Sequence, residues 1–279
     1  MRSTIQWLAV GALACGVTAQ EGLPQSGEVA LKAKIRRSQK LMLPSEMATP
    51  VATGFHFQDG FGADFRADID GTALLIDADA DGTLETRVEG ETGFVVLTSN
   101  GRRYGVSLSA KPSWSFKAGS EVQGKIGSTK IRLIDQNHNG SFNDIGEDAM
   151  VVGNGRAASF LSEVVSIDGE LRSLTVAADG SKLSYAPFTG KVGKLSLHAV
   201  TDGKVMAAVL NSKDGRYSVH LSKQDAEVLV PAGDYLLHSG VLSLAGSRVT
   251  MQKGRSVPVT VTADAGKVLS WGGPAKAEF

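Results

Sequence analysis

The sequence has a single cysteine, Cys15, and therefore cannot form a disulfide within the chain. Exported proteins commonly use disulfides to stabilise their folds. If this chain is exported, its stability must come from an ample core or from another source, and a bound metal ion is a natural candidate.

Excess charge of either sign is also missing, because 29 lysine and arginine residues balance 29 aspartate and glutamate residues. Nucleic acids and anionic membrane surfaces attract basic proteins, so neither partner is favoured. Residues 32–40 contain a short basic run, but no aromatic side chains are interleaved with its cations. We interpret this run as the solvated face of a strand rather than as a nucleic-acid site.

Long hydrophobic runs are absent too, and a membrane-spanning helix needs roughly 20 apolar residues. A shorter apolar run, residues 5–14, follows Arg2 and precedes the small residues 17–19. This order is typical of a secretory signal peptide. It predicts a signal peptide over residues 1–19, a mature chain that begins at Gln20 and no transmembrane segment.

A second way of processing the N-terminus is open. The segment Ala12-Leu13-Ala14-Cys15 resembles the lipobox of bacterial lipoproteins. That resemblance implies cleavage before Cys15 and a lipidated product. In both cases we expect an extracytoplasmic protein, either periplasmic or secreted, and in the second case the protein is anchored through Cys15.

Turn-forming dipeptides are abundant where these features are scarce. Asp-Gly and Asn-Gly pairs, which favour hairpin turns, begin at Asp59, Asp70, Asp81, Asn100, Asn139, Asn154, Asp168, Asp179, Asp202 and Asp214. Between them apolar residues alternate with polar ones, for example over residues 195–199, 217–221 and 257–261. Period-two alternation is typical of half-buried strands. The fold class is therefore predicted to be all-β.

The distribution of acidic loops divides the chain. We expect one strand and a linker over residues 20–50, followed by a hairpin-rich β-domain over residues 51–188 that contains two acidic loops. Strand-like runs without acidic loops follow, and we assign residues 189–279 to a C-terminal β-sandwich.

One motif supports the C-terminal assignment. The segment Val230-Pro231-Ala232-Gly233-Asp234-Tyr235 resembles the Pro-x-Gly-x-Tyr turn and strand of prealbumin-like sandwich domains, as found in carboxypeptidase regulatory-type and Cna-B-type modules. The resemblance implies a sandwich in which the ring of Tyr235 packs between two sheets. Such modules are usually accessory rather than catalytic.

The two acidic loops are an internal repeat, because residues 75–84 and 133–142 align without a gap. Oxygen-bearing side chains occupy loop positions one, three and five, and glycine occupies position six. This spacing directs oxygen atoms toward a hard cation while glycine permits the sharp turn. A carbonyl at position seven and a carboxylate at the thirteenth position add further donors.

Both loops resemble the Asp-x-Asp-x-Asp-Gly calcium loops of EF-hand, dockerin and thrombospondin-type proteins. The resemblance implies calcium. The predicted ligands are Asp77, Asp79, Asp81, Thr83 and Glu89 in the first loop, and Asp135, Asn137, Asn139, Ser141 and Glu147 in the second. Other oxygen donors nearby are Glu85, Asn143, Asp144 and Asp148.

Two features separate these loops from a helix–loop–helix hand. The EF-hand pattern places glutamate one position earlier, where Val88 and Gly146 stand. Strand-like runs flank both loops, so we expect them to cap hairpins. The competing interpretation is a pair of hydrated turns without metal, since Asp-Gly and Asn-Gly form turns unaided.

Signatures of catalysis are missing from the sequence. It contains no Gly-x-Ser-x-Gly, no His-Glu-x-x-His and no histidines at metal-ligand spacing. We assign no catalytic residue, and expect a calcium-stabilised structural, adhesive or carbohydrate-binding protein of the cell envelope. Its partner would be an envelope polysaccharide or another surface protein. The alternative is an extracytoplasmic, glycosidase-like hydrolase, because the carboxylate pair of such enzymes is brought together by the fold.

Overall fold

The computed structural model describes residues 25–37, 40–45, 47–200, 203–221, 225–244, 246–251 and 257–271. The predicted signal peptide, Cys15 and Gln20 lie outside these residues, so export stays a prediction. Among the described residues, no helix is long and apolar enough to cross a membrane.

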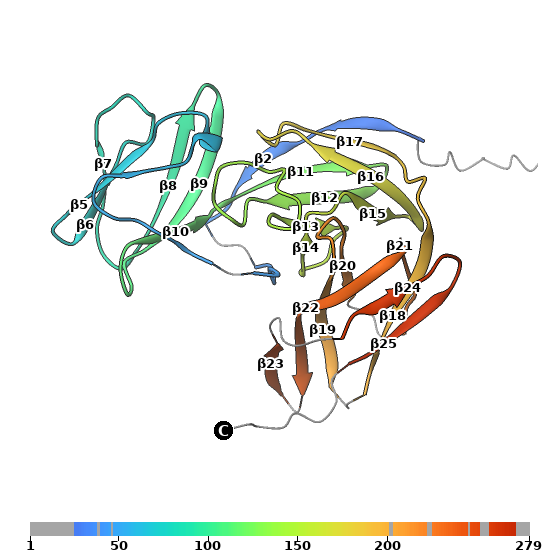
Figure 1. Cartoon of the computed structure of the whole chain (residues 1–279). Coiled ribbons are helices and arrows are strands. Elements are labelled where there is room, and N and C mark those ends of the chain that lie inside the picture. The colour runs from blue at the N-terminus through green and yellow to red at the C-terminus, as the bar shows by residue number, and fades with distance from the viewer. Residues whose placement is uncertain are drawn as a thin grey trace, which may run out of the picture.

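Strands dominate the described chain, and its only helical element is the short 3-10 turn η1 (Asp59–Phe61). The prediction of an all-β fold is confirmed. The strands form six sheets, which Figure 1 shows as a lobe containing β5–β10, a central part containing β11–β17 and a lower part containing β18–β25.

Two sheets enclose the core of the central part. The five-stranded sheet runs in the order β14 (Ser159–Phe160), β13 (Ala149–Val152), β12 (Thr129–Ile134), β11 (Ser120–Ile126) and β2 (Lys32–Ile35). The four-stranded sheet runs in the order β1 (Gly27–Ala30), β17 (Lys182–Pro187), β16 (Glu170–Val176) and β15 (Val164–Ile167). Side chains from both sheets, such as Leu133 and Leu174, share one apolar core.

The same core continues into two smaller sheets. One contains β3 (Thr49–Pro50), β10 (Ser115–Ala118), β9 (Arg102–Ser109) and β8 (Thr92–Ser99). The other contains β4 (Phe55–His56), β5 (Arg66–Asp70), β6 (Ala73–Ile76) and β7 (Thr86–Val88). Edge-on aromatic contacts, with ring centroids 5.5 Å apart for Phe57 and Phe61 and 4.5 Å apart for Phe61 and Tyr104, connect η1 to this core.

The C-terminal strands pack as two sheets on a separate core. One sheet contains β21 (Val228–Pro231), β18 (Val192–Ala199) and β25 (Gly266–Trp271). The other contains β20 (Ser218–Leu221), β19 (Lys204–Ser212), β22 (Gly233–Leu244), β23 (Ser247–Met251) and β24 (Val259–Val261). Tyr235 is only 1% exposed in this core, and its hydroxyl donates to the carbonyl of Pro231 at 2.8 Å.

Residues 20–50 were expected to form one strand and a linker, but the described part of this segment forms more strands than that. Its described part contributes β1, β2 and β3 to three different sheets. The alternating run over residues 29–35 divides at Leu31, whose backbone N–H donates to the carbonyl of Ser181 at 2.8 Å. Apolar and polar residues alternate on both sides of Leu31, so the alternation does not reveal that the chain changes sheet there.

Direct contacts connect the C-terminal sandwich to the central sheet. The hydroxyl of Ser218 accepts from the backbone N–H of Phe160 at 3.1 Å, and Arg216 pairs with Glu163 at 2.6 Å. Ala157 also packs with Ala207 and Val241 in a small apolar cluster. The boundary near residue 189 stays a prediction, although the sandwich has a core of its own.

We expect residues 190–279, expressed alone, to unfold cooperatively, because their two sheets enclose a separate core. The loss of the Ser218 and Arg216 contacts should lower the melting temperature relative to the same transition in the full chain. Circular dichroism during a thermal scan measures both properties. A fragment that shows no β-type spectrum or no transition would refute the boundary.

Replacing Gly240 by alanine should destabilise the sandwich, because a Cβ there would come within 2.3 Å of the indole of Trp271. Overpacking of this kind costs about 1–3 kcal/mol. Chemical denaturation measures the change in the free energy of unfolding. The matched control is Gly155→Ala, since nothing lies within 4 Å of a Cβ at Gly155. Equal stabilities for the two variants would contradict the packing argument.

Candidate metal centre

The first acidic loop connects β6 to β7 and is organised by the carboxylate of Asp77. Its two oxygens accept from the backbone N–H groups of Asp81 at 3.1 Å and Gly82 at 2.9 Å. Ala80 and Gly82 adopt positive φ values of 60° and 92°. Glycine meets this requirement at little cost, which explains its place at position six.

The second loop, between β12 and β13, repeats this geometry. The carboxylate of Asp135 accepts from the N–H groups of Asn139 at 3.2 Å and Gly140 at 2.7 Å. His138 and Gly140, at the same loop positions, have φ values of 61° and 83°. The repeat seen in the sequence is therefore also a repeat of one turn.

The side chains at position five match as well. Asp81 accepts from the backbone N–H of Thr83 at 2.7 Å, and Asn139 accepts from that of Ser141 at 2.8 Å. In both loops one side-chain oxygen is thus occupied by the turn itself. The second oxygen of Asp81 is left for another partner, whereas Asn139 has an amide nitrogen in its place.

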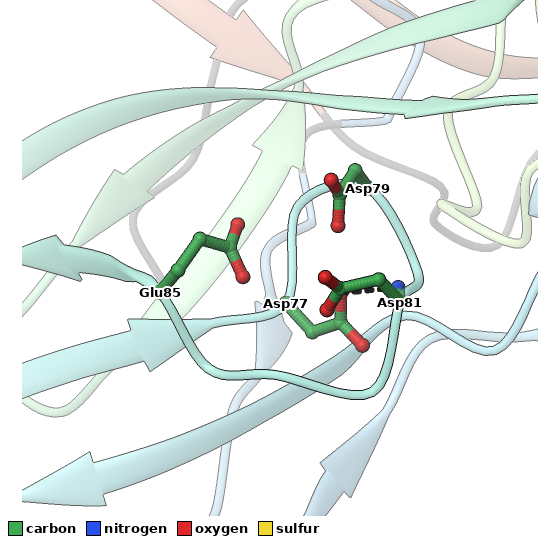
Figure 2. Close-up of side chains that lie close together, drawn as sticks. All are labelled: Asp77, Asp79, Asp81 and Glu85. Atoms are coloured by element: carbon green, nitrogen blue, oxygen red, sulfur yellow. Dashed lines mark hydrogen bonds between the residues drawn. The ribbon is translucent and has the colours of Figure 1, made fainter.

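Four carboxylates gather in the first loop: Asp77, Asp79, Asp81 and Glu85, each of which offers an oxygen within 4.8 Å of the others. Figure 2 shows Asp79 and Glu85 directed toward Asp77 and Asp81 from two sides of the loop. Asp77 is buried and the other three are exposed. This group of hard oxygen donors could hold a metal ion.

The structure places Glu85, rather than the predicted Glu89, beside the three aspartates. Glu89 instead pairs with Arg87 at 2.8 Å. Glu85 also accepts from the backbone N–H of Ala78 at 3.1 Å, which holds its carboxylate against the loop. The strand β7 begins at Thr86, so Glu85 is the last side chain before the backbone leaves the loop.

The second loop brings a different set of oxygens together. Asp144 accepts from the side-chain amides of Asn137 at 3.1 Å and Asn139 at 2.7 Å, and Glu147 accepts from Asn137 at 2.9 Å. Glu147 was predicted as a ligand from the sequence, whereas Asp144 was named only among other oxygen donors nearby. The predicted ligand Ser141 contributes its N–H to the turn.

The second loop contains two buried carboxylates, whereas Asp77 is the one buried carboxylate of the first loop's acidic group. Asp135 and Asp148 are both 0% exposed. Burial raises the pKa of Asp135 to about 6. Burial, with the added charge of Asp135, raises the pKa of Asp148 to about 8. Among the described residues no lysine or arginine forms an ion pair with either carboxylate, so a bound cation would relieve this electrostatic cost.

The second loop also joins two parts of the N-terminal half. The hydroxyl of Tyr104 in β9 donates to Asp135 at 2.8 Å. A Cβ at Gly140 would come within 2.4 Å of the backbone nitrogen of Phe61 in η1. Neither contact had a signal in the sequence, because Tyr104 lies 31 residues from Asp135.

Comparisons with protein-family models, with curated proteins and with solved structures found no match to this chain. The likeness to calcium loops and to prealbumin-like sandwiches therefore remains a resemblance.

Replacing Tyr104 by phenylalanine should destabilise the N-terminal half. The change removes the only side-chain donor to the buried carboxylate of Asp135 among the described residues. Hydrogen bonds to charged groups contribute about 1.5–3 kcal/mol. Urea denaturation measures the loss. Tyr185→Phe is the matched control, because Tyr185 is equally buried, in the same core, and donates no side-chain hydrogen bond among the described residues. A loss no larger than that of the control would contradict a structural role for the bond.

Proposed function

We propose that this chain is an exported, non-catalytic structural, adhesive or carbohydrate-binding protein whose N-terminal half is stabilised by calcium at its two acidic loops. The observation that carries the metal proposal is the group formed by Asp77, Asp79, Asp81 and Glu85, on a turn that the second loop repeats. Export rests on the pattern of residues 1–19 alone.

The donor set favours calcium over other common ions. All candidate ligands are carboxylate, amide, hydroxyl or carbonyl oxygens, which suit hard cations. Zinc prefers histidine and cysteine, and neither residue type joins the group in the first loop. Magnesium demands a strict octahedron, whereas calcium tolerates the irregular arrangement of a loop with exposed carboxylates.

The oxygen donors of the second loop also support calcium binding. Asp144 lies within hydrogen-bonding distance of Asn137 and Asn139, so one carboxylate and two amide side chains already converge. Calcium there would be held by fewer charges than in the first loop, which lowers its affinity. Its benefit would come from neutralising the buried carboxylate of Asp135.

A calcium-dependent fold suits an extracytoplasmic chain that cannot form disulfides. Binding to the native state alone stabilises it by mass action. The hydrolase alternative requires two carboxylates that face one cavity. Five cavities in the described part of the chain each have at most one carboxylate among their lining residues. We therefore propose binding rather than hydrolysis.

Removal of calcium should lower the melting temperature of the full chain. A site with a dissociation constant of about 0.1 mM contributes about 1.4 kcal/mol at about 1 mM free ion. Two such sites correspond to a shift of roughly 5–15 °C on chelation. Differential scanning calorimetry with and without a chelator measures the shift. An unchanged melting temperature, with no heat in a calcium titration, would show that the loops are plain turns.

The first loop offers a sharp test of its ligands. Asp79→Asn and Glu85→Gln should each remove about half of the chelation shift. Asp79 makes no hydrogen bond to the turn among the described contacts, and its replacement relieves repulsion between carboxylates, so the metal-free stability should not fall. Glu89→Gln is the matched control and should keep the full shift, because Glu89 pairs with Arg87. If Glu89→Gln reduced the chelation shift and Glu85→Gln did not, Glu89 would be the ligand, as expected from the sequence.

A further inference from the structure

One face of the central sheet collects cations from three strands. Lys32 and Lys34 extend from β2, Lys125 from β11, and Lys130 and Arg132 from β12. We refer to these five side chains as the basic face. The strand β2 is separated from β12 by nearly a hundred residues of sequence, so the group exists only in the folded chain.

The strand register places these side chains on the same side of the sheet. Gln123 lies opposite Lys32 on one neighbour and opposite Arg132 on the other. Lys125 lies opposite Lys130. Directly opposed residues of antiparallel strands project to the same face. The other face of these strands carries Val122 and Leu133, which are buried in the core.

In the described part of the chain, the cations of the basic face outnumber the acidic side chains beside them. Among the described residues none of the five cations forms an ion pair. The one acidic side chain in this register, Glu121, pairs with Arg36 at 3.1 Å. Burial lowers the pKa of Lys130. The charges of Arg132 and Lys34 lower it further, whereas the charge of Glu121 raises it. The cations are thus close enough to repel one another.

The side chains of the basic face are accessible to solvent. Lys32, Lys34 and Lys125 are exposed, and Lys130 and Arg132 are half-buried. Arg132 is held in place by its hydrogen bond to the carbonyl of Gly155 at 2.5 Å. Cations two residues apart on a strand are about 7 Å apart, and neighbouring strands are about 5 Å apart. The cations are therefore carried by paired strands, which set the spacing of their backbones.

We propose that the basic face binds a linear anionic polysaccharide, through salt bridges to its carboxylate or sulfate groups. Charge complementarity carries the proposal, because an excess of positive charge on the face of a sheet fits an extended chain with regularly repeated negative charges. The proposal names the partner class for the binding role above and rests on that role, but it does not depend on the calcium loops.

Other polyanions fit this surface less well. Nucleic-acid-binding surfaces combine cations with aromatic side chains that stack on bases, and the three strands place no aromatic residue on the basic face. Membrane-surface binding commonly adds apolar side chains that insert between lipids. None of the large apolar residues exposed in the described chain lies on β2, β11 or β12.

The test measures binding of the full chain to heparin, as a sulfated linear polysaccharide, by titration calorimetry at constant calcium. Replacement of Lys32 and Lys125 together by glutamine should raise the dissociation constant roughly tenfold and reduce its dependence on salt. The matched control replaces Lys191 and Lys267, which are exposed on the C-terminal sandwich, and should retain the original affinity. Replacement of Lys32 and Lys125 by arginine should also retain it.

Each outcome decides the proposal. Loss of affinity in the basic-face variant alone, with an unchanged melting temperature, supports it. Absence of heparin binding at low salt, or an equal loss in the control, overturns it. Equally tight binding of a thymidine oligonucleotide or of phosphatidylglycerol vesicles would assign the face to a different partner and also overturn it. A chelation shift that persists in a chain without heparin binding would leave the calcium proposal standing.

Discussion

The carboxylate of Asp135 is buried where three parts of the N-terminal half meet. It closes the turn of its own loop through the N–H groups of Asn139 and Gly140, and it accepts from Tyr104 in β9. The same loop presses against η1 at Phe61. A buried charge is expensive unless it is fully hydrogen-bonded or neutralised, so the surrounding chain has to keep this arrangement. The chain cannot form a disulfide, and the contacts of this loop with Tyr104 and Phe61 help to hold the sheets together.

The two loops have the same turn geometry but lie in different surroundings. In the first, Asp77 is buried but Asp79, Asp81 and Glu85 are exposed, and the loop is the connection of a small hairpin. In the second, Asp135 and Asp148 have no solvent exposure. A cation in the exposed loop could exchange freely with solvent and would stabilise mainly its own hairpin. A cation in the buried loop would offset charge at a junction between sheets and would affect the core as a whole.

The proposed calcium loops and the basic face use opposite charges at separate places, which explains how a chain of zero net charge can contain both. The acidic side chains of the two loops lie in turns, where calcium or water can solvate them. The cations of the basic face lie along three strands, and strand pairing sets the spacing of their backbones. The basic run at residues 32–40 looked like an ordinary solvated strand because its neighbours in space are distant in sequence.

Local chemistry determined the strands and the turns of this protein. Period-two alternation identifies strands, and the Asp-Gly or Asn-Gly turns need positive φ values that few residues adopt, so the all-β class and the likeness of the loops at Asp77 and Asp135 could be derived from sequence. Tertiary structure alone decided which distant groups meet. Glu85 rather than Glu89 closes the first loop because β7 begins at Thr86 and turns Glu89 toward Arg87. Tyr104 reaches Asp135, and Lys130 joins Lys32 on one face, because strand pairing is non-local and leaves no trace in the spacing of residues along the chain.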